Sequence, residues 1–125
     1  MINVQNLCFD YPGKRALHEV SFQLEPQSIT ALVGANGAGK TTLLRCLAAL
    51  DHWSIGTIEI DGVNAEEYPR EIHRKCSYLS DYFGLYDELS VRESLKFIAM
   101  SKLAPANQVD ELVKTAAKRL NLMDY

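Results

Sequence analysis

The sequence of 125 residues is poor in cysteine and tryptophan and contains no long apolar run. Its longest stretch without a charged side chain, residues 26–39, contains proline and glycine and is too short to cross a bilayer. The first residues also lack the basic start and the continuous apolar segment of a signal peptide. We therefore expect a chain with neither a membrane span nor a signal peptide of its own.

The cysteines, the histidines and the net charge give no indication of a disulfide framework, a metal site or a nucleic-acid-binding surface. Cys8, Cys46 and Cys76 are scattered, odd in number and without a C-x-x-C pair, which favours buried, reduced thiols of a cytosolic protein. The three histidines show no metal-ligand spacing. A net charge of −3 argues against electrostatic attachment to nucleic acid or to anionic membranes. We expect no nucleic-acid partner.

The segment 34–41 reads G-x-x-x-x-G-K-T, the pattern of a phosphate-binding loop. It follows an apolar run at 29–33 and opens a helical run at 40–50, the strand–loop–helix context that this loop requires. Its glycines allow backbone N–H groups to converge on phosphate oxygens, and the helix start adds unpaired donors. Lys40 is expected to reach the terminal phosphates, and the Thr41 hydroxyl to coordinate Mg²⁺.

The remaining periodicity predicts a mixed chain. Residues 2–4, 20–25 and 57–60 alternate like half-buried strands, and 29–33 and 76–80 are expected to be short core strands. Asp61-Gly62 is a turn signal, and residues 66–75 are predicted to be helical with Pro69 in the first turn. Ser90 and Glu93 form the pattern of a capping box before a helix, and a last helix is expected from about Ala106.

Four segments in collinear order resemble the ATPase subunit of ABC transporters, over nearly the whole chain. They are the loop with its flank (36–44), the segment 9–14, the strand and turn at 57–62, and the segment 85–95. The resemblance implies an α/β P-loop NTPase with an N-terminal antiparallel β subdomain and the start of a helical subdomain, apparently truncated. The corresponding boundaries are 1–27 and 55–63 for the β subdomain, 28–54 and 64–84 for the core, and 85–125 for the helical part.

The resemblance also assigns roles to residues. Tyr11 takes the place of the aromatic that stacks on adenine, and a tyrosine on a turn offers a π-face to a base. Lys40 and Asp81 are expected at the catalytic centre, and Thr41 and Asp81 at Mg²⁺. The residues expected to bind ATP are Tyr11, Gly34, Ala35, Asn36, Gly37, Ala38, Gly39, Lys40, Thr41 and Thr42.

The sequence departs from the family pattern in three ways. Asp81 stands where the family usually has a glutamine, and its carboxylate can still ligate Mg²⁺ although it is shorter and negative. Gln27-Ser28 replaces a turn glycine. The L-S-G-G-Q signature loop, the second metal-binding strand with its catalytic glutamate and the switch histidine do not occur in the 125 residues. We therefore expect an N-terminal piece that alone binds ATP weakly and hydrolyses it negligibly.

As part of a whole subunit, the resemblance implies ATP-driven transport. The expected partners are a transmembrane permease and a second ATPase subunit, in a homo- or heterodimer. The chain would then be cytoplasmic and peripheral on the inner face of the cell membrane. Residues 82–86 lie where the family's coupling surface begins, and their aromatic side chains suit a docking patch.

Two alternatives remain open from the sequence. A small GTPase is suggested by D-x-x-G at 81–84 and by an imitation of N-K-x-D at 121–124. Against it, Leu122 replaces the lysine, and strand-like segments already precede the phosphate loop. The second alternative is a non-catalytic nucleotide-binding regulatory module, which the missing second metal strand fits as well as truncation does.

Overall fold

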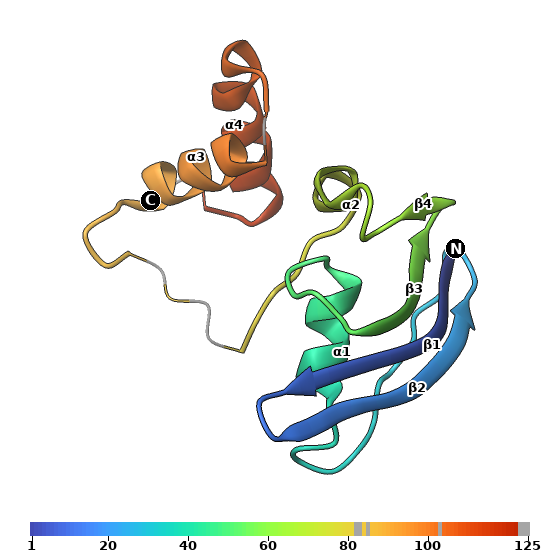
Figure 1. Cartoon of the computed structure of the whole chain (residues 1–125). Helices are drawn as coiled ribbons and strands as arrows, with labels where there is room; N and C mark the ends of the chain where they lie inside the picture. The colour runs from blue at the N-terminus through green and yellow to red at the C-terminus, as the bar shows by residue number, and fades with distance from the viewer. Residues whose placement is uncertain (82–83, 85, 103, 123–125) are drawn as a thin grey trace. The chain divides into compact units, whose positions relative to one another are not determined.

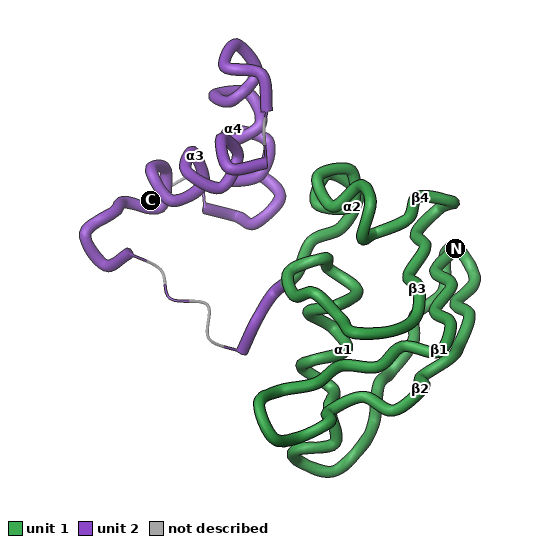
Figure 2. The backbone as a smooth tube through the Cα atoms, viewed as in Figure 1, with its two compact units in different colours: residues 1–78 green, residues 79–125 purple. Residues whose placement is uncertain are grey.

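The computed structural model describes residues 1–81, 84, 86–102 and 104–122, and it divides the chain into two compact units. The first unit spans Met1–Tyr78 and the second spans Leu79–Tyr125 (Figure 2). The two GTPase-like motifs and the segment 82–86 each include residues outside the described ranges. Those three expectations stay predictions.

A four-stranded antiparallel sheet forms the first unit, in the order β2-β1-β3-β4 (Figure 1). Its strands are β1 (Ile2–Tyr11), β2 (Lys14–Leu24), β3 (Ile55–Ile60) and β4 (Val63–Asn64). The predicted alternation of residues 2–4, 20–25 and 57–60 is confirmed. Val4 lies opposite Phe22 on one side and opposite Ile58 on the other, so apolar side chains from three strands meet on one face.

Tight turns close both hairpins of the sheet. Asp61 and Gly62 join β3 to β4 with φ values of 49° and 74°, the left-handed pair that a two-residue hairpin of this kind requires. This confirms the turn predicted from the Asp-Gly pair. Pro12 and Gly13 join β1 to β2, and Tyr11 lies opposite Lys14 at the end of that ladder. The hairpin therefore places Tyr11 at the tip of the sheet.

Four α-helices and one short 3₁₀ turn make up the rest of the described secondary structure. They are α1 (Lys40–Leu47), α2 (Pro69–Lys75), α3 (Val91–Ser101), the 3₁₀ turn Ala106–Gln108 and α4 (Val109–Arg119). Pro69 is the first residue of α2, as predicted. The capping box before α3 is confirmed, because the Glu93 N–H donates to Ser90 Oγ at 3.3 Å and the Ser90 N–H donates to Glu93 Oε2 at 2.9 Å.

Two predicted helices are shorter than expected, for local reasons. The helix expected from residue 66 begins at Pro69, because Asn64 Oδ1 accepts the N–H groups of Glu66 and Glu67 and holds them in a turn. The helix expected to reach residue 50 ends at Leu47. There Ala49 takes a left-handed conformation with φ 52°.

The end of α1 is a Schellman motif. The N–H of Ala49 donates to the Cys46 carbonyl at 2.9 Å, and the N–H of Leu50 donates to the Arg45 carbonyl at 3.0 Å. These two bonds satisfy carbonyls that the last helical turn leaves unpaired. An alanine occupies the position at which glycine is usual, so the motif forms here at a conformational cost.

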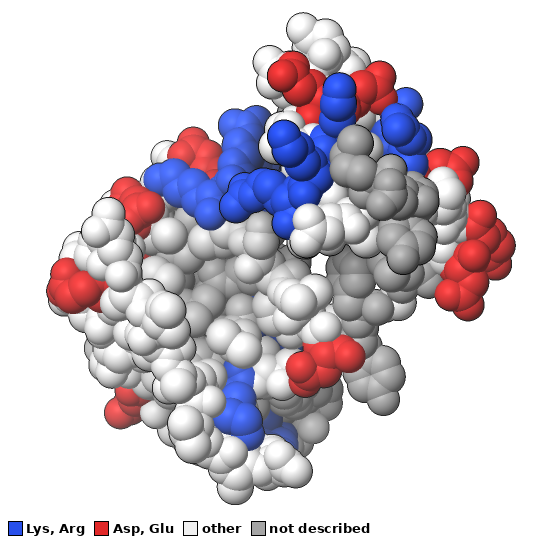
Figure 3. Space-filling model, turned by 180° about the vertical axis from the view of Figure 1, so that it is seen from behind, with Lys and Arg blue, Asp and Glu red and all other residues white. Residues whose placement is uncertain are grey.

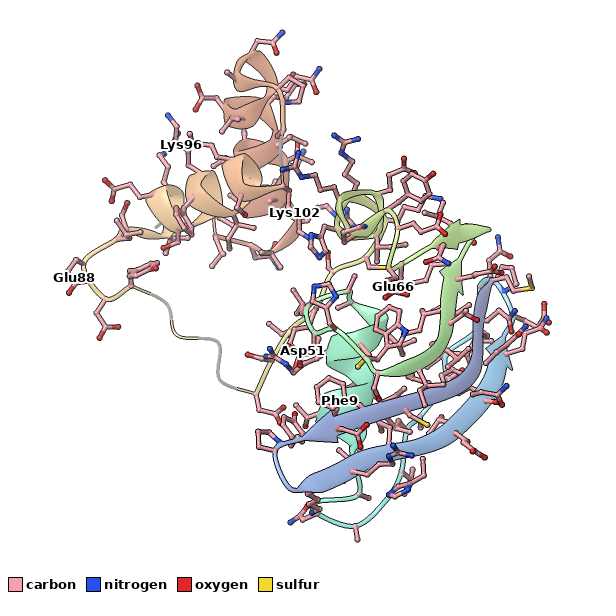
Figure 4. All side chains as sticks on the ribbon, viewed as in Figure 1. Phe9, Asp51, Glu66, Glu88, Lys96 and Lys102 are labelled. Carbon is pink, nitrogen blue, oxygen red and sulfur yellow. The ribbon has the colours of Figure 1, made fainter. Side chains whose placement is uncertain are left out.

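The core of the first unit is formed by the sheet, α1 and α2. Its buried members are Val4, Leu7, Phe9, Leu17, Leu43, Cys46, Ile58, Ile60, Ala65 and Ile72. Phe9, which Figure 4 labels on β1, belongs to this cluster. Burial raises the pKa of the Cys46 thiol to about 11, so this group is a neutral thiol at physiological pH. Cys8 is buried as predicted, whereas Cys76 is only partly buried, and none of the three cysteines, which all lie in the described part of the chain, forms a disulfide.

The expectation of core strands at 29–33 and 76–80 is not met, because the structure assigns no strand to either segment. Ile29 is 104% exposed and Val33 is 89% exposed. A strand requires a neighbouring backbone to pair its N–H and C=O groups. Neither segment is paired in the sheet that the described residues form. The apolar run at 29–33 therefore lies outside the sheet and is exposed.

The second unit is a helix pair with little buried apolar surface. Val109 and Val113 of α4 are buried, and α3 has no buried residue. Tyr86 and Phe97 make an edge-to-face contact with ring centroids 5.8 Å apart, and Lys96 lies 3.8 Å from Asp110. Among the described residues, no helix combines the length and the hydropathy that a membrane-spanning segment needs.

Charge is unevenly placed on the surface. Figure 3 shows the basic and acidic side chains on the face drawn there. On α2, the exposed Arg70, Arg74 and Lys75 contribute basic charge. Two of them lie in the last turn, where cations interact favourably with the helix dipole. The net negative charge therefore coexists with local positive areas.

Candidate nucleotide-binding site

The loop 34–39 enters α1 through glycines that no other residue replaces easily. Gly37 and Gly39 have φ values of 80° and 91°, in the left-handed region. A Cβ on Gly39 would lie 2.7 Å from the Ala16 carbonyl oxygen and 2.9 Å from Leu17 Cδ2. The last glycine of the loop thus packs directly on β2. This contact fixes the loop against the sheet.

Backbone donors at the start of α1 are available to a ligand. The first bond of the helix runs from the Leu43 N–H to the Gly39 carbonyl at 2.8 Å, and no side chain caps this end. The N–H groups of Gly39, Lys40 and Thr41 have no hydrogen-bond partner among the residues that the structure describes. Such amides, at the positive end of a helix dipole, form an anion site. The loop has the geometry of a phosphate cradle.

Lys40 places its ammonium group at the mouth of this cradle. Its Nζ donates to the carbonyl oxygens of Gly34 and Ala35, at 2.7 and 2.8 Å. These two bonds hold the lysine side chain across the loop and give its charge a partner. A phosphate oxygen is a stronger acceptor for an ammonium group than a neutral carbonyl is. The side chain is therefore positioned to exchange loop carbonyls for phosphate.

The two threonines after Lys40 have different environments. Thr41 is exposed, so its hydroxyl is open to a ligand. Thr42 is only 6% exposed and turns into the unit. One protein hydroxyl suits Mg²⁺, which keeps several waters and takes further oxygens from substrate phosphates. No group of three or more His, Cys, Asp or Glu residues forms a separate metal cage among the described residues. Thr41 fits Mg²⁺ held on a nucleotide.

Tyr11 lies beside the same helix. The residue is 46% exposed, and its ring contacts the Phe9 ring with centroids 4.9 Å apart at an interplanar angle of 59°. The Tyr11 hydroxyl lies 3.2 Å from Thr42 Oγ1 and shares a hydrogen bond with it. The structure thus brings Tyr11 and the phosphate loop together in one unit, as the sequence interpretation requires.

Asp81 belongs to the second unit, whereas the other candidate site residues belong to the first. Its carboxylate therefore stays a predicted metal ligand and catalytic group.

Sequence analysis missed an ion pair that locks the end of α1. Arg45 Nε and Nη2 each donate to a different carboxylate oxygen of Asp51 at 2.6 Å, a bidentate pair (Figure 4 labels Asp51). The hydrogen bond from Arg45 holds the pKa of the Asp51 carboxyl below its usual value. The signal was an arginine in the last turn of the helix followed by an aspartate six residues on. The pair fastens the helix that carries the loop.

Gln27 belongs to the Gln27-Ser28 pair that replaces the turn glycine of the family pattern. Its φ is 59°, a left-handed conformation in which a side chain is unfavourable. The departure noted in the sequence therefore falls on a residue with positive φ, just before the exposed segment 29–33.

A family model described as ABC transporter matches residues 17–125. The chain belongs to the ABC transporter family. This membership confirms the resemblance seen in the sequence, and it favours an ABC cassette over the small GTPase alternative.

Individual ABC relatives give the same result. The chain is 30% identical to the ABC transporter ATP-binding protein NatA of Bacillus subtilis, covering 89% of the chain and 46% of that protein. It is 36% identical to the ABC-type transporter ATP-binding protein EcsA of Bacillus subtilis, covering 81% of the chain and 41% of that protein. The chain thus spans less than half the length of these two relatives.

Solved structures of ABC cassettes share the fold. An ATP-binding subunit of an ABC transporter matches with a TM-score of 0.80 and 26% identity, over 99% of this chain and 52% of that one. A dimeric ATP-binding cassette bound to ADP and Pi matches with a TM-score of 0.82 and 22% identity, over 97% and 56% of the two chains. These neighbours confirm the predicted fold class, an ABC-type P-loop NTPase cassette, and the chain spans about half of their length.

Proposed function

We propose that this chain binds ATP with Mg²⁺ at the loop 34–41. The observation that carries the proposal is the convergence of unpaired amides of Gly39, Lys40 and Thr41 with the Lys40 ammonium group at one helix start. In the bound state the amides and Gly34–Gly37 surround the phosphates, and Lys40 transfers its bonds from the loop carbonyls to phosphate oxygens. Thr41 ligates Mg²⁺, and the Tyr11 ring stacks on adenine.

The rest of the catalytic apparatus belongs, in this proposal, to the whole protein. Phosphoryl transfer depends on metal placement and on an oriented water, and this chain supplies the nucleotide cradle and part of a metal site. Asp81 is proposed as the residue that adds a second oxygen ligand near the γ-phosphate. The complete subunit would hydrolyse ATP, and the 125 residues by themselves would bind it weakly with negligible turnover.

Membership of the ABC transporter family supports the proposed setting. ATP hydrolysis would drive transport through a transmembrane permease, with a second ATPase subunit as dimer partner. The chain would then work on the cytoplasmic side of the cell membrane, attached through the permease. Names of relatives such as the putrescine transport ATP-binding protein PotG of Escherichia coli, 32% identical over the whole chain, support this setting.

The test is ATP titration of the Lys40→Ala variant by calorimetry with Mg²⁺. Removing the ammonium group takes away the charge that faces the phosphates, so we expect at least about a hundredfold loss of affinity. Lys118→Ala is the matched control, because Lys118 is an exposed lysine on α4. Equal ATP affinity in the wild type and Lys40→Ala, with both proteins folded, would refute the site.

A further inference from the structure

We propose that Thr42 positions the Tyr11 ring, on which adenine stacks in the proposed complex and which we call the adenine platform. The Thr42 hydroxyl fixes this ring through the 3.2 Å hydrogen bond. The inference rests on the proposed ATP site and adds to it a physical link between base recognition and the phosphate loop. Sequence alone placed Thr42 only among the residues around the nucleotide.

Tyr11 occupies a place in the chain where a side chain has few neighbours. It is the last residue of β1 and precedes the hairpin turn, and nearly half of it is exposed. The Phe9 ring contacts the Tyr11 ring at a tilt of 59°, and Thr42 Oγ1 shares a hydrogen bond with the Tyr11 hydroxyl. The ring contact and the hydrogen bond together restrict the direction in which the Tyr11 side chain leaves the strand.

Thr42 is a rigid anchor. It is the third residue of α1 and its side chain is 6% exposed, and the next residue, Leu43, belongs to the core. A threonine side chain in a helix is largely restricted to two χ1 rotamers, so the helix leaves few positions for its hydroxyl group. Because Thr41 precedes it directly, the same helical turn carries the expected Mg²⁺ ligand and the anchor of the base platform.

The hairpin and the phosphate loop are joined at a second point. Gly39 packs on the Ala16 carbonyl and on Leu17 of β2, on the same β1–β2 hairpin whose tip carries Tyr11. The adenine platform, Tyr11, and the phosphate-binding loop 34–39 therefore form one pre-organised surface. Ordering a free side chain on binding reduces affinity, so losing the hydrogen bond should weaken ATP binding by about 2- to 10-fold.

The experiment compares Mg²⁺–ATP with Mg²⁺–tripolyphosphate, which lacks the base, by calorimetry on the full 125-residue chain. The variants are Tyr11→Phe, Thr42→Val and the double variant. Tyr11→Phe keeps the ring and Thr42→Val keeps the shape, so each removes one partner of the hydrogen bond. We expect each single variant to lower the ratio of ATP to tripolyphosphate affinity by about 2- to 10-fold, and the double variant to lower it no further.

Thr42→Ser is the matched control because it keeps the hydroxyl; it is expected to keep most of the wild-type affinity ratio. A wild-type ratio in Tyr11→Phe would overturn the proposal. The proposal would also be overturned if the double variant lowered the affinity ratio by the product of the two single effects. Additive free-energy losses would mean that Tyr11 and Thr42 act independently. Melting curves of all variants establish that each protein compared is folded.

Failure of this inference can be told apart from failure of the proposed function. Tyr11→Ala removes the ring itself and should lower ATP affinity more than tripolyphosphate affinity. If Tyr11→Ala does so and Tyr11→Phe does not, stacking stands and the positioning role of Thr42 is wrong. If neither variant changes the affinity ratio, the adenine platform is wrong as well, while Lys40→Ala still tests the phosphate site.

Discussion

The two units of this chain hold their structures in different ways. In the first, residues distant in sequence meet: β1 pairs with β3 across some fifty residues, and α1 adds Leu43 and Cys46 to the core. In the second, the contacts join α3 and α4, helices close to one another in sequence, and only Val109 and Val113 are buried among its described residues. A core made by distant segments fixes geometry, and the candidate phosphate cradle and Tyr11 lie in that first unit.

The largest expected effect tests the core of the first unit. Ile58 is fully buried in β3, so Ile58→Ala should reduce the free energy of unfolding by about 3 kcal/mol. Val113→Ala in α4 removes fewer atoms from a smaller core and should cost about 1.5 kcal/mol. Denaturant unfolding followed by the fluorescence of Trp53, which lies in the first unit, measures the effect of Ile58→Ala. Equal losses at Trp53 from both substitutions would contradict the comparison.

The next effect concerns the joint between loop and sheet. Gly39→Ala forces a side chain into a left-handed backbone and against the Ala16 carbonyl, so we expect a loss of about 2 kcal/mol in stability. The same change should weaken ATP binding, because the loop has to leave β2. Gly13→Ala is a useful control: its φ is 78°, but a Cβ there meets nothing within 4 Å. It should retain ATP binding.

A smaller effect tests whether local signals hold the second unit. Ser90→Ala removes the capping-box oxygen that accepts the Glu93 N–H, which should cost about 1 kcal/mol of helix stability. Hydrogen exchange should quicken for α3 amides while amides of β1 and β3 keep their wild-type rates. Slower or unchanged exchange in α3 would show that tertiary contacts hold that helix instead.

The smallest effect is a gain. Ala49 occupies the left-handed position of the Schellman motif after α1, so Ala49→Gly should raise stability by about 0.5–1 kcal/mol. The Arg45–Asp51 pair next to it is unaffected by the change. Thermal melting measures the gain. A lower melting temperature would mean that the methyl group of Ala49, which packs on the core, matters more than its backbone strain.

Local chemistry accounts for the elements that were predicted correctly. The Asp61-Gly62 turn, Pro69 at the start of α2 and the Ser90–Glu93 capping box each depend on residues at most a few positions apart. The phosphate loop is likewise a local pattern of glycines before a helix. Such signals need no knowledge of the rest of the fold, because the groups that satisfy one another are neighbours in sequence.

Features that depend on a pairing or hydrogen-bonding partner far along the chain were predicted wrongly or not at all. The apolar run 29–33 has strand composition, yet it has no pairing neighbour in the described sheet and is exposed. The Tyr11–Thr42 bond spans 31 residues, and no short-range pattern announces it. The left-handed Ala49 was missed because alanine is a poor signal for a helix end.

The amino-acid sequence by itself determined the phosphate-binding loop, the turns, the helix caps and the family resemblance. Each of these is written in the spacing of a few residues, whose backbone preferences and hydrogen-bonding groups act at short range. Only the tertiary structure decided that Gly39 rests on β2 and that Thr42 holds Tyr11. Those contacts exist because the sheet and α1 bury a common core, which brings the tip of a hairpin beside the start of a helix.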